Sequence, residues 1–190
     1  GFEAPGIPGA LLGAAPRAEA MLLPADGALG VASLLVEGAA LRVEGSGRVA
    51  RDALEARIDA RVADVAAFGT GVSGALRAEA RIEGSPGDMT LDIALASDAL
   101  SRDGFALDAP RARATLRGLP ATPSGRIALE ARVGEAPVAA TLAGARGGDG
   151  AWHLALETLE FPGLAASGEA RGRDLAPQAA RLEARARDLA

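Results

Sequence analysis

The stretch from Gly74 to Leu95 constrains the fold most, because two runs of alternating residues flank a short break. In the first run, apolar residues at positions 76, 78, 80 and 82 alternate with arginine and glutamate. In the second, apolar residues at 89, 91, 93 and 95 alternate against Thr90 and Asp92. A period of two with one apolar side is the signature of a half-buried strand. Because the break at residues 85–88 contains Pro and Gly, we predict an antiparallel hairpin.

Similar alternating segments, separated by Gly- and Pro-containing breaks, follow one another along the chain. Glycine and proline number 25 and 11 of 190 residues, which fits many short strands joined by turns. An apolar content of 49% and the regular alternation argue against disorder. We therefore predict an all-β fold, an elongated and curved antiparallel sheet with one or two short helical turns.

Five local features qualify this prediction. Residues 54–62 alternate as a strand, but Leu54, Ile58 and Val62 also recur at helical spacing, so a helix stays open as the alternative. Asp64 is placed to cap a short helical turn over residues 64–68. Pro110 is expected either to shift the phase of a strand over 105–117 or to mark a strand start, and a bulge should re-phase the strand between 156 and 159. Residues 98–104 are predicted to form a polar loop.

We divide the chain into an irregular leader, residues 1–18, and a repetitive segment, residues 19–190. Residues 180–189 match residues 56–65 at a spacing of 124, and Ser167-Gly168 echoes Ser46-Gly47. This internal repeat, near residues 46–65 and 167–189, favours an elongated repetitive sheet. Because the chain begins with Gly1 and ends within an alternating run, we expect it to be a fragment of a longer protein.

Charge and cysteine content exclude several classes of function. The net charge is −5 with the two signs interleaved and no lysine, so we expect no nucleic-acid partner. With no cysteine there are no disulfides and no thiolate metal sites, which is compatible with a bacterial periplasm. No apolar run approaches the roughly 18 to 20 residues of a membrane span.

No catalytic constellation is visible, and we expect a non-enzymatic protein without cofactor or metal. His153, the one histidine, lies on the charged side of a strand with no partner residues nearby in sequence, which favours an exposed structural histidine. The Gly147–Gly150 run occurs once, without the nonapeptide period of calcium-binding repeats, so it predicts a flexible loop.

The apolar side of the strands is the remaining candidate site. Its large residues alternate with alanine, which leaves more room above a sheet than a tightly filled sandwich core does. We therefore predict an open, lipid-binding groove, while a closed β-solenoid or sandwich acting as a spacer or adhesin stays the alternative. The predicted groove residues are Leu54, Ile58, Val62, Leu76, Ile82, Met89, Leu91, Ile93, Leu95, Leu116, Ile127, Leu129, Val133, Val138, Leu142, Leu154 and Leu156.

The succession of elements resembles the C-terminal half of the TamB family (translocation and assembly module inner-membrane components), within the wider AsmA-like group. The resemblance covers roughly residues 40–190 and has no single specific motif. It is carried by the DVAAF turn at residues 64–68 and by residues 69–97, 118–144, 148–172 and 181–190.

The resemblance implies a trough-like β-groove, the "β-taco", with an apolar interior that shields and conducts phospholipid acyl chains. It implies a periplasmic location within a parent protein anchored in the inner membrane. Members of the family are implicated in moving phospholipid to the outer membrane. They also support outer-membrane protein assembly with the outer-membrane barrel TamA, which other parts of the parent protein would contact. The family has no catalytic residues.

Overall fold

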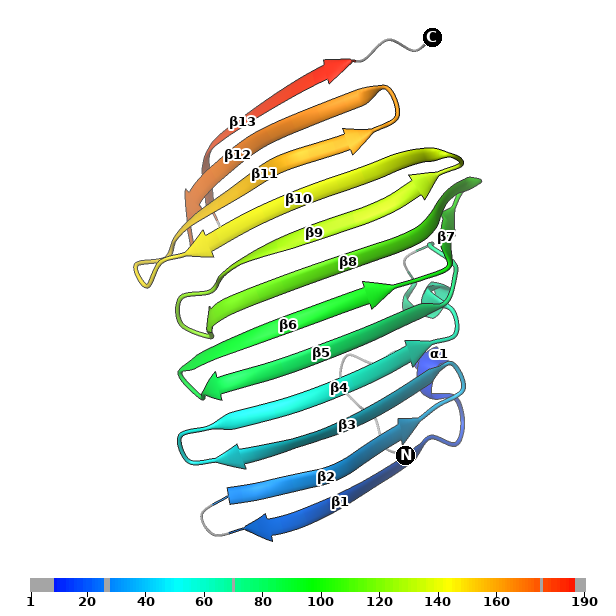
Figure 1. Ribbon diagram of the computed structural model, residues 1–190, viewed down its shortest axis with the longest axis vertical. Helices are drawn as coiled ribbons and strands as arrows, with labels where there is room; N and C mark the ends of the chain where they lie inside the picture. The colour runs from blue at the N-terminus through cyan, green and yellow to red at the C-terminus, as the bar shows by residue number, and fades with distance from the viewer. Residues whose placement is uncertain (1–8, 26–27, 70, 175, 187–190) are drawn as a thin grey trace.

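The protein is one large antiparallel β-sheet that is not closed into a barrel, which confirms the predicted all-β class. The computed structural model describes residues 9–25, 28–69, 71–174 and 176–186. Thirteen strands form the sheet, and twelve of them follow one another in chain order from β1 at one edge to β13 at the other. Only β7 leaves this path and pairs with β8 alone. Figure 1 shows the strands stacked along the long axis of the molecule as a simple meander.

The strands have the following bounds. They are β1 (Arg17–Ala25), β2 (Ala28–Glu37), β3 (Leu41–Ala50), β4 (Leu54–Val62), β5 (Leu76–Ser85), β6 (Asp88–Ala96), β7 (Ala99–Arg102), β8 (Phe105–Leu119), β9 (Ser124–Val133), β10 (Ala136–Arg146), β11 (Ala151–Phe161), β12 (Leu164–Arg173) and β13 (Ala176–Ala186).

The hairpin predicted at residues 74–95 is present as β5 and β6, joined by a turn at Pro86-Gly87. The segment 54–62 is strand β4 and not a helix. It pairs along its length with β3 on one side and β5 on the other. Its helical spacing is overridden because these two neighbours satisfy its backbone groups and only the period of two puts Glu55 and Arg61 in water.

Two predicted changes of phase occur where the sequence places them. The pairing of β8 with β9 shifts between Asp108 and Arg111, and Ala109 just before Pro110 has φ +47°. The pairing of β11 with β12 shifts between Leu156 and Leu159. In each case the extra residue keeps the apolar side chains on one side of the sheet on both sides of the bulge.

The predicted polar loop at residues 98–104 is wrong in part, because Ala99–Arg102 forms the short strand β7. This strand pairs with the first residues of β8, and its Ser101 exchanges two backbone hydrogen bonds with Ser73 of the β4–β5 connection, at 2.9 and 3.0 Å. Four residues are too few to show an alternating pattern in the sequence. The strand forms because its backbone pairs with β8 on one side and with Ser73 on the other.

Two short helices complete the described chain. Helix α1 (Gly9–Leu12) lies within the predicted irregular leader, and β1 begins at Arg17, two residues before the predicted start of the repetitive segment at residue 19. The first part of the leader, residues 1–8, lies outside the described residues. The predicted helical turn is the 3₁₀-helix η1 (Val65–Phe68). Asp64 caps it by accepting a hydrogen bond from the Ala66 N–H at 3.0 Å.

The two segments of the predicted internal repeat occupy corresponding places in two hairpins. Residues 46–47 lie in β3 and are followed by β4, while residues 167–168 lie in β12 and are followed by β13. The pairing differs by two residues, since Gly47 lies opposite Ala56 and Gly168 lies opposite Leu182. The last matched residues, 187–189, lie outside the described residues.

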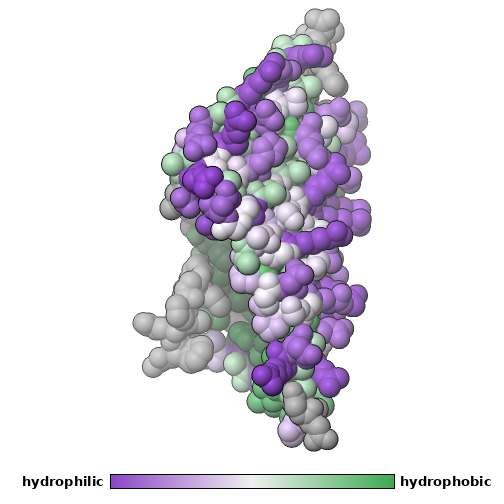
Figure 2. All heavy atoms as spheres, turned by 90° about the vertical axis from the view of Figure 1, so that its left-hand side faces the viewer, coloured by the Kyte–Doolittle hydropathy of each residue, from purple (hydrophilic) through white to green (hydrophobic). Residues whose placement is uncertain are grey.

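The sheet has a polar face and an apolar face. Figure 2 shows hydrophilic side chains projecting in rows on one side, while hydrophobic residues gather on the other side, which is hollowed. The described chain has only one small cluster of buried core residues, Leu11, Val62 and Val65. Most of the apolar surface is therefore half-buried between neighbouring side chains of a single layer.

Candidate functional site: the apolar face of the sheet

The strand register carries apolar residues across the whole width of the sheet. Residues directly opposite in an antiparallel pair point to the same face, so a row can be followed from strand to strand. We call the set of residues reached in this way the apolar face. Its middle row, one residue per strand from β1 to β13 with β7 omitted, is Ala20, Leu34, Gly45, Ile58, Ala80, Ile93, Ala114, Ile127, Leu142, Leu156, Gly168 and Leu182.

This row contains no polar side chain and mixes large residues with glycine and alanine. Twelve strands at about 4.8 Å spacing make it roughly 50 Å long. Small residues next to large ones leave hollows along the row. At Gly125, in a neighbouring row, a Cβ atom would lie 2.6 Å from Leu116 Cδ2, so the leucine already occupies the space beside the glycine.

All seventeen predicted groove residues fall on the apolar face by this register. They differ in exposure. Val62 and Val138 are buried, Ile127, Leu142 and Leu154 are exposed, and the other twelve are half-buried. The exposure follows position along the strands. The buried members lie toward the strand ends that η1 adjoins, and the exposed members lie in the middle and toward the opposite ends.

Helix α1 covers one part of the apolar face. Leu11, only 1% exposed, packs with Val62 and Val65, and Leu41, Leu76 and Leu100 surround this cluster. The Ala40 and Ala39 N–H groups donate to the carbonyls of Leu11 and Leu12 at 3.0 and 3.2 Å, which fixes the helix to the β2–β3 turn. Val62 is thus part of a small core. Its side chain is not exposed to a ligand in the way that the predicted groove requires.

The β7–β8 hairpin reaches over a second part. The rings of Phe105 and Phe161 stack with centroids 6.1 Å apart, although β9 and β10 lie between their strands in the sheet. In a flat sheet, three strand spacings would separate β8 from β11 by about 14 Å. The sheet is therefore curved here, with the apolar face on the inside. Ala131, Val138 and Ala140 of β9 and β10 are buried.

The side of the apolar face away from α1 and η1 is open. Leu29 and Val49, which lie near the strand ends on this open side, are about half exposed, at 46% and 45%, and Leu154 is 54% exposed. We call the edge formed by the β1–β2, β3–β4, β5–β6, β8–β9, β10–β11 and β12–β13 turns the open rim. The apolar face is thus a trough that is closed along parts of one side and accessible from the other.

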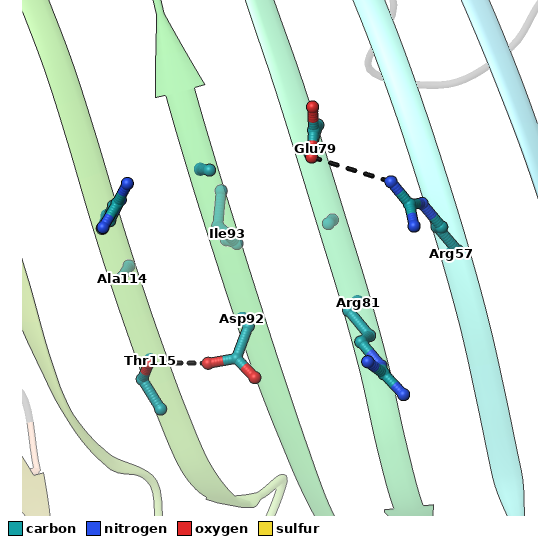
Figure 3. Close-up of a pocket in the computed structure, with 10 residues that line it drawn as sticks. Arg57, Glu79, Arg81, Asp92, Ile93, Ala114 and Thr115 are labelled. Atoms are coloured by element: carbon teal, nitrogen blue, oxygen red, sulfur yellow. Dashed lines mark hydrogen bonds and ion pairs between the residues drawn. The ribbon is translucent and has the colours of Figure 1, made fainter.

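The opposite, polar face carries interleaved arginine and acidic residues. Figure 3 shows a shallow depression on it, about 290 Å³ in volume, between β4, β5, β6 and β8. Arg57 Nη2 lies 3.8 Å from Glu79 Oε2, and Thr115 Oγ1 donates to Asp92 Oδ1 at 2.6 Å. Exposed pairs of this kind contribute little stability because water screens them. The depression is therefore a shallow, polar part of the solvent-exposed surface.

Two carboxylates have shifted acidities, and both have structural causes. Hydrogen bonds from the backbone N–H groups of Ala66 and Gly74 lower the pKa of Asp64. The pKa of Asp149 is lowered mainly by the Ala151 N–H and also by Arg173, whose Nη2 lies 3.0 Å from Oδ2. Each aspartate fixes a turn, and neither faces a second carboxylate or a histidine as an acid–base pair would require.

His153 lies on the polar face, exposed, with Nε2 3.5 Å from Glu169 Oε2. No group of three or more metal-ligating side chains occurs among the described residues. In the same part of the chain, no helix is long and apolar enough to cross a membrane.

Sequence reasoning missed part of the apolar face. The register adds members in the first three strands and in the last three, which carry weak or re-phased alternation. They include Leu29, Val31, Leu34, Val36, Leu41, Val43, Val49, Leu159, Phe161 and Leu182. The bulge between Val31 and Leu34 hides the period of two in β2. Following each half of β2 separately would have found its members Leu29, Val31, Leu34 and Val36.

Fold and face together define an all-β protein built as one open antiparallel sheet with an exposed apolar surface. No family model, curated protein or solved structure matches the chain.

Proposed function

We propose that this chain is a non-enzymatic lipid-binding segment whose apolar face shields phospholipid acyl chains from water. One observation carries the proposal: an unbroken apolar row crosses twelve strands, and no second sheet covers it within the described residues. An exposed apolar surface of this extent is unfavourable in water unless something binds it. At about 0.8 kcal/mol per buried methylene, covering a 14-carbon chain contributes on the order of 10 kcal/mol.

The shape of the trough supports the same function. A closed sandwich would bury its large residues, yet Ile127 and Leu142 in the middle row are 43% and 44% exposed. Because every row runs across the strands, a hydrocarbon chain could move along the long axis without meeting a charged residue in the middle row. Lipid conduction needs only this continuity and no chemistry.

The proposal extends to the family and the location that the sequence resembles. A TamB-like groove segment would work in the periplasm, between an inner-membrane anchor and the outer membrane, and would support outer-membrane protein assembly with TamA through other parts of the parent protein. The curved, open sheet and the absence of cysteine from the sequence support this assignment. We expect the parent protein to be found in the periplasm and to crosslink to phospholipid there in cells.

The direct test places a charge in the trough. Ile93→Arg and Leu129→Arg are expected to abolish photocrosslinking to a phospholipid that carries a diazirine in its acyl chain, while the β circular-dichroism signal stays. The matched controls are Ala94→Arg and Ala128→Arg. Each puts the same side chain at the residue adjacent to the test position, on the polar face. They should crosslink like the wild type.

Two outcomes would contradict the proposal. Unchanged crosslinking in Ile93→Arg and Leu129→Arg would show that lipid does not occupy the apolar face. Unfolding of both variants, with both controls folded, would indicate a closed structural core such as a spacer or adhesin contains.

A further inference from the structure

Outside the β7–β8 hairpin, one charged residue of the described strands has the register of the apolar face. Arg146, the last residue of β10, is directly opposite Trp152, two positions beyond Gly144 and four beyond Leu142. Among the described strands outside the β7–β8 hairpin, every other arginine and acidic residue has the register of the polar face. Since a charge on an apolar surface is unfavourable without a partner or water, this exception calls for a reason.

Arg146 is held at the open rim by its backbone. Its N–H donates to the Pro123 carbonyl of the β8–β9 turn at 2.8 Å, and the Gly147 N–H donates to the Ala151 carbonyl at 2.7 Å. The residue is exposed, so its aliphatic stem can lie along the apolar face while the guanidinium reaches water. Arg146 thus lies where the apolar face meets the solvent.

The only tryptophan of the chain lies beside it. The Trp152 indole covers the buried Gly172 of β12, where an added Cβ atom would lie 2.6 Å from Cε2 of the ring. An indole has an apolar body and one N–H donor, so it suits the boundary between hydrocarbon and polar headgroup. The exposed side chains of Leu154 and Leu142 continue from this pair toward the middle row.

The carboxylate of the adjoining loop is already engaged. Asp149 binds Arg173 at 3.0 Å and accepts from the Ala151 N–H at 3.1 Å. Arg173 also donates to the Asp149 carbonyl at 2.9 Å. The other acidic residue near this loop is Asp174, beside Gly150. Arg146 itself forms no ion pair with any residue that the structure describes, so its guanidinium is available to an anion.

We propose that Arg146 binds the phosphate of a glycerophospholipid whose acyl chains lie on the apolar face, with Trp152 at the level of the glycerol backbone. The proposal rests on the proposed function and specifies its ligand. A guanidinium matches phosphate oxygens with two parallel N–H donors, which gives both charge and geometry. The trough would thus hold a lipid in one orientation, headgroup at the open rim and tails inward.

The experiment uses Trp152 as its own reporter. Wild-type chain is titrated with dioctanoyl phosphatidylglycerol and with dioctanoylglycerol, which has the same chains and no phosphate, and the tryptophan emission is followed. Both lipids should shift the emission to the blue. Arg146→Gln should weaken phosphatidylglycerol binding about tenfold or more and leave dioctanoylglycerol binding unchanged. Arg146→Lys should recover part of the loss, and Arg57→Gln on the polar face should change neither.

The outcomes separate the two proposals. If neither lipid binds the wild type, the proposed function fails. If both bind and Arg146→Gln weakens both equally or neither, the headgroup contact alone is overturned. Inorganic phosphate is the third ligand, and it should not compete at the concentrations where the lipid binds. Arg146-dependent binding of phosphate as tight as that of the lipid would instead indicate a site for a free anion.

Discussion

Phe105 and Phe161 stack with 6.1 Å between ring centroids and 26° between ring planes, across two intervening strands. The two residues belong to β8 and β11, so their contact ties the β7–β8 hairpin to a later part of the meander. Because most strands of this sheet pair with their neighbours in chain order, a contact across two intervening strands is a long-range tie. It holds the apolar face concave over β9 and β10.

The pair should therefore show a measurable coupling free energy. A double-mutant cycle of Phe105→Leu and Phe161→Leu is expected to give about 0.5–1.5 kcal/mol of coupling in urea denaturation, the range for stacked aromatic pairs. Each single variant should also increase crosslinking of lipid near Val138, because the hairpin no longer covers that region. A coupling of zero would mean that the rings merely lie near each other and do not hold the curvature.

Leu11 is expected to be the most sensitive position in the small core. Its side chain is 1% exposed and packs on Val62 and Val65, so Leu11→Ala should lower the free energy of unfolding by about 2–5 kcal/mol. Leu22→Ala is the matched control, since Leu22 in the edge strand β1 is 55% exposed and the same substitution should cost little. Denaturant titration of both variants checks this.

If Leu11→Ala lowered the free energy of unfolding by no more than Leu22→Ala does, α1 would not stabilise the sheet. A large loss in Leu11→Ala alone would confirm that α1 closes part of one side of the trough. In that variant Val62 should become accessible.

The strands could be predicted because alternation and turn chemistry agree along most of the chain. In β5 and β6 every second residue is apolar and Pro86-Gly87 supplies the turn, so the hairpin and its register follow from the sequence. The same pattern gave all seventeen face residues from β4 to β11. Where a bulge interrupts the period, as between Val31 and Leu34, the alternation no longer identifies the face.

The closure of the trough could not be predicted from local pattern. Leu11 belongs to a short apolar segment. The two buried residues that it packs against, Val62 and Val65, lie more than fifty residues away in the sequence. Phe105 and Phe161 are likewise distant in sequence, and nothing in either strand indicates that the two rings meet. Arg146 appears in sequence as one more charge before a glycine-rich loop. Only its pairing with Trp152 places it on the apolar face.

The pH dependence of stability should contain a contribution from Asp64. Backbone hydrogen bonds from Ala66 and then Gly74 lower the pKa of its carboxyl in the folded chain below the ordinary value near 4 of an unfolded chain. The folded state therefore binds this proton less readily than the unfolded state does. The stabilisation is fully present above the ordinary pKa and is lost as the pH falls through the lowered folded value.

Asp64→Asn keeps an oxygen that can accept the same two hydrogen bonds but removes the charge and the titration. Its melting temperature should lie a few degrees below that of the wild type at pH 7, and the gap should shrink as the pH is lowered below about 4, because the wild type then loses its anionic cap. Thermal melts of both proteins from pH 7 to pH 3 provide the measurement. A gap that stays constant over this range would show that the carboxylate charge does not stabilise the turn between β4 and β5.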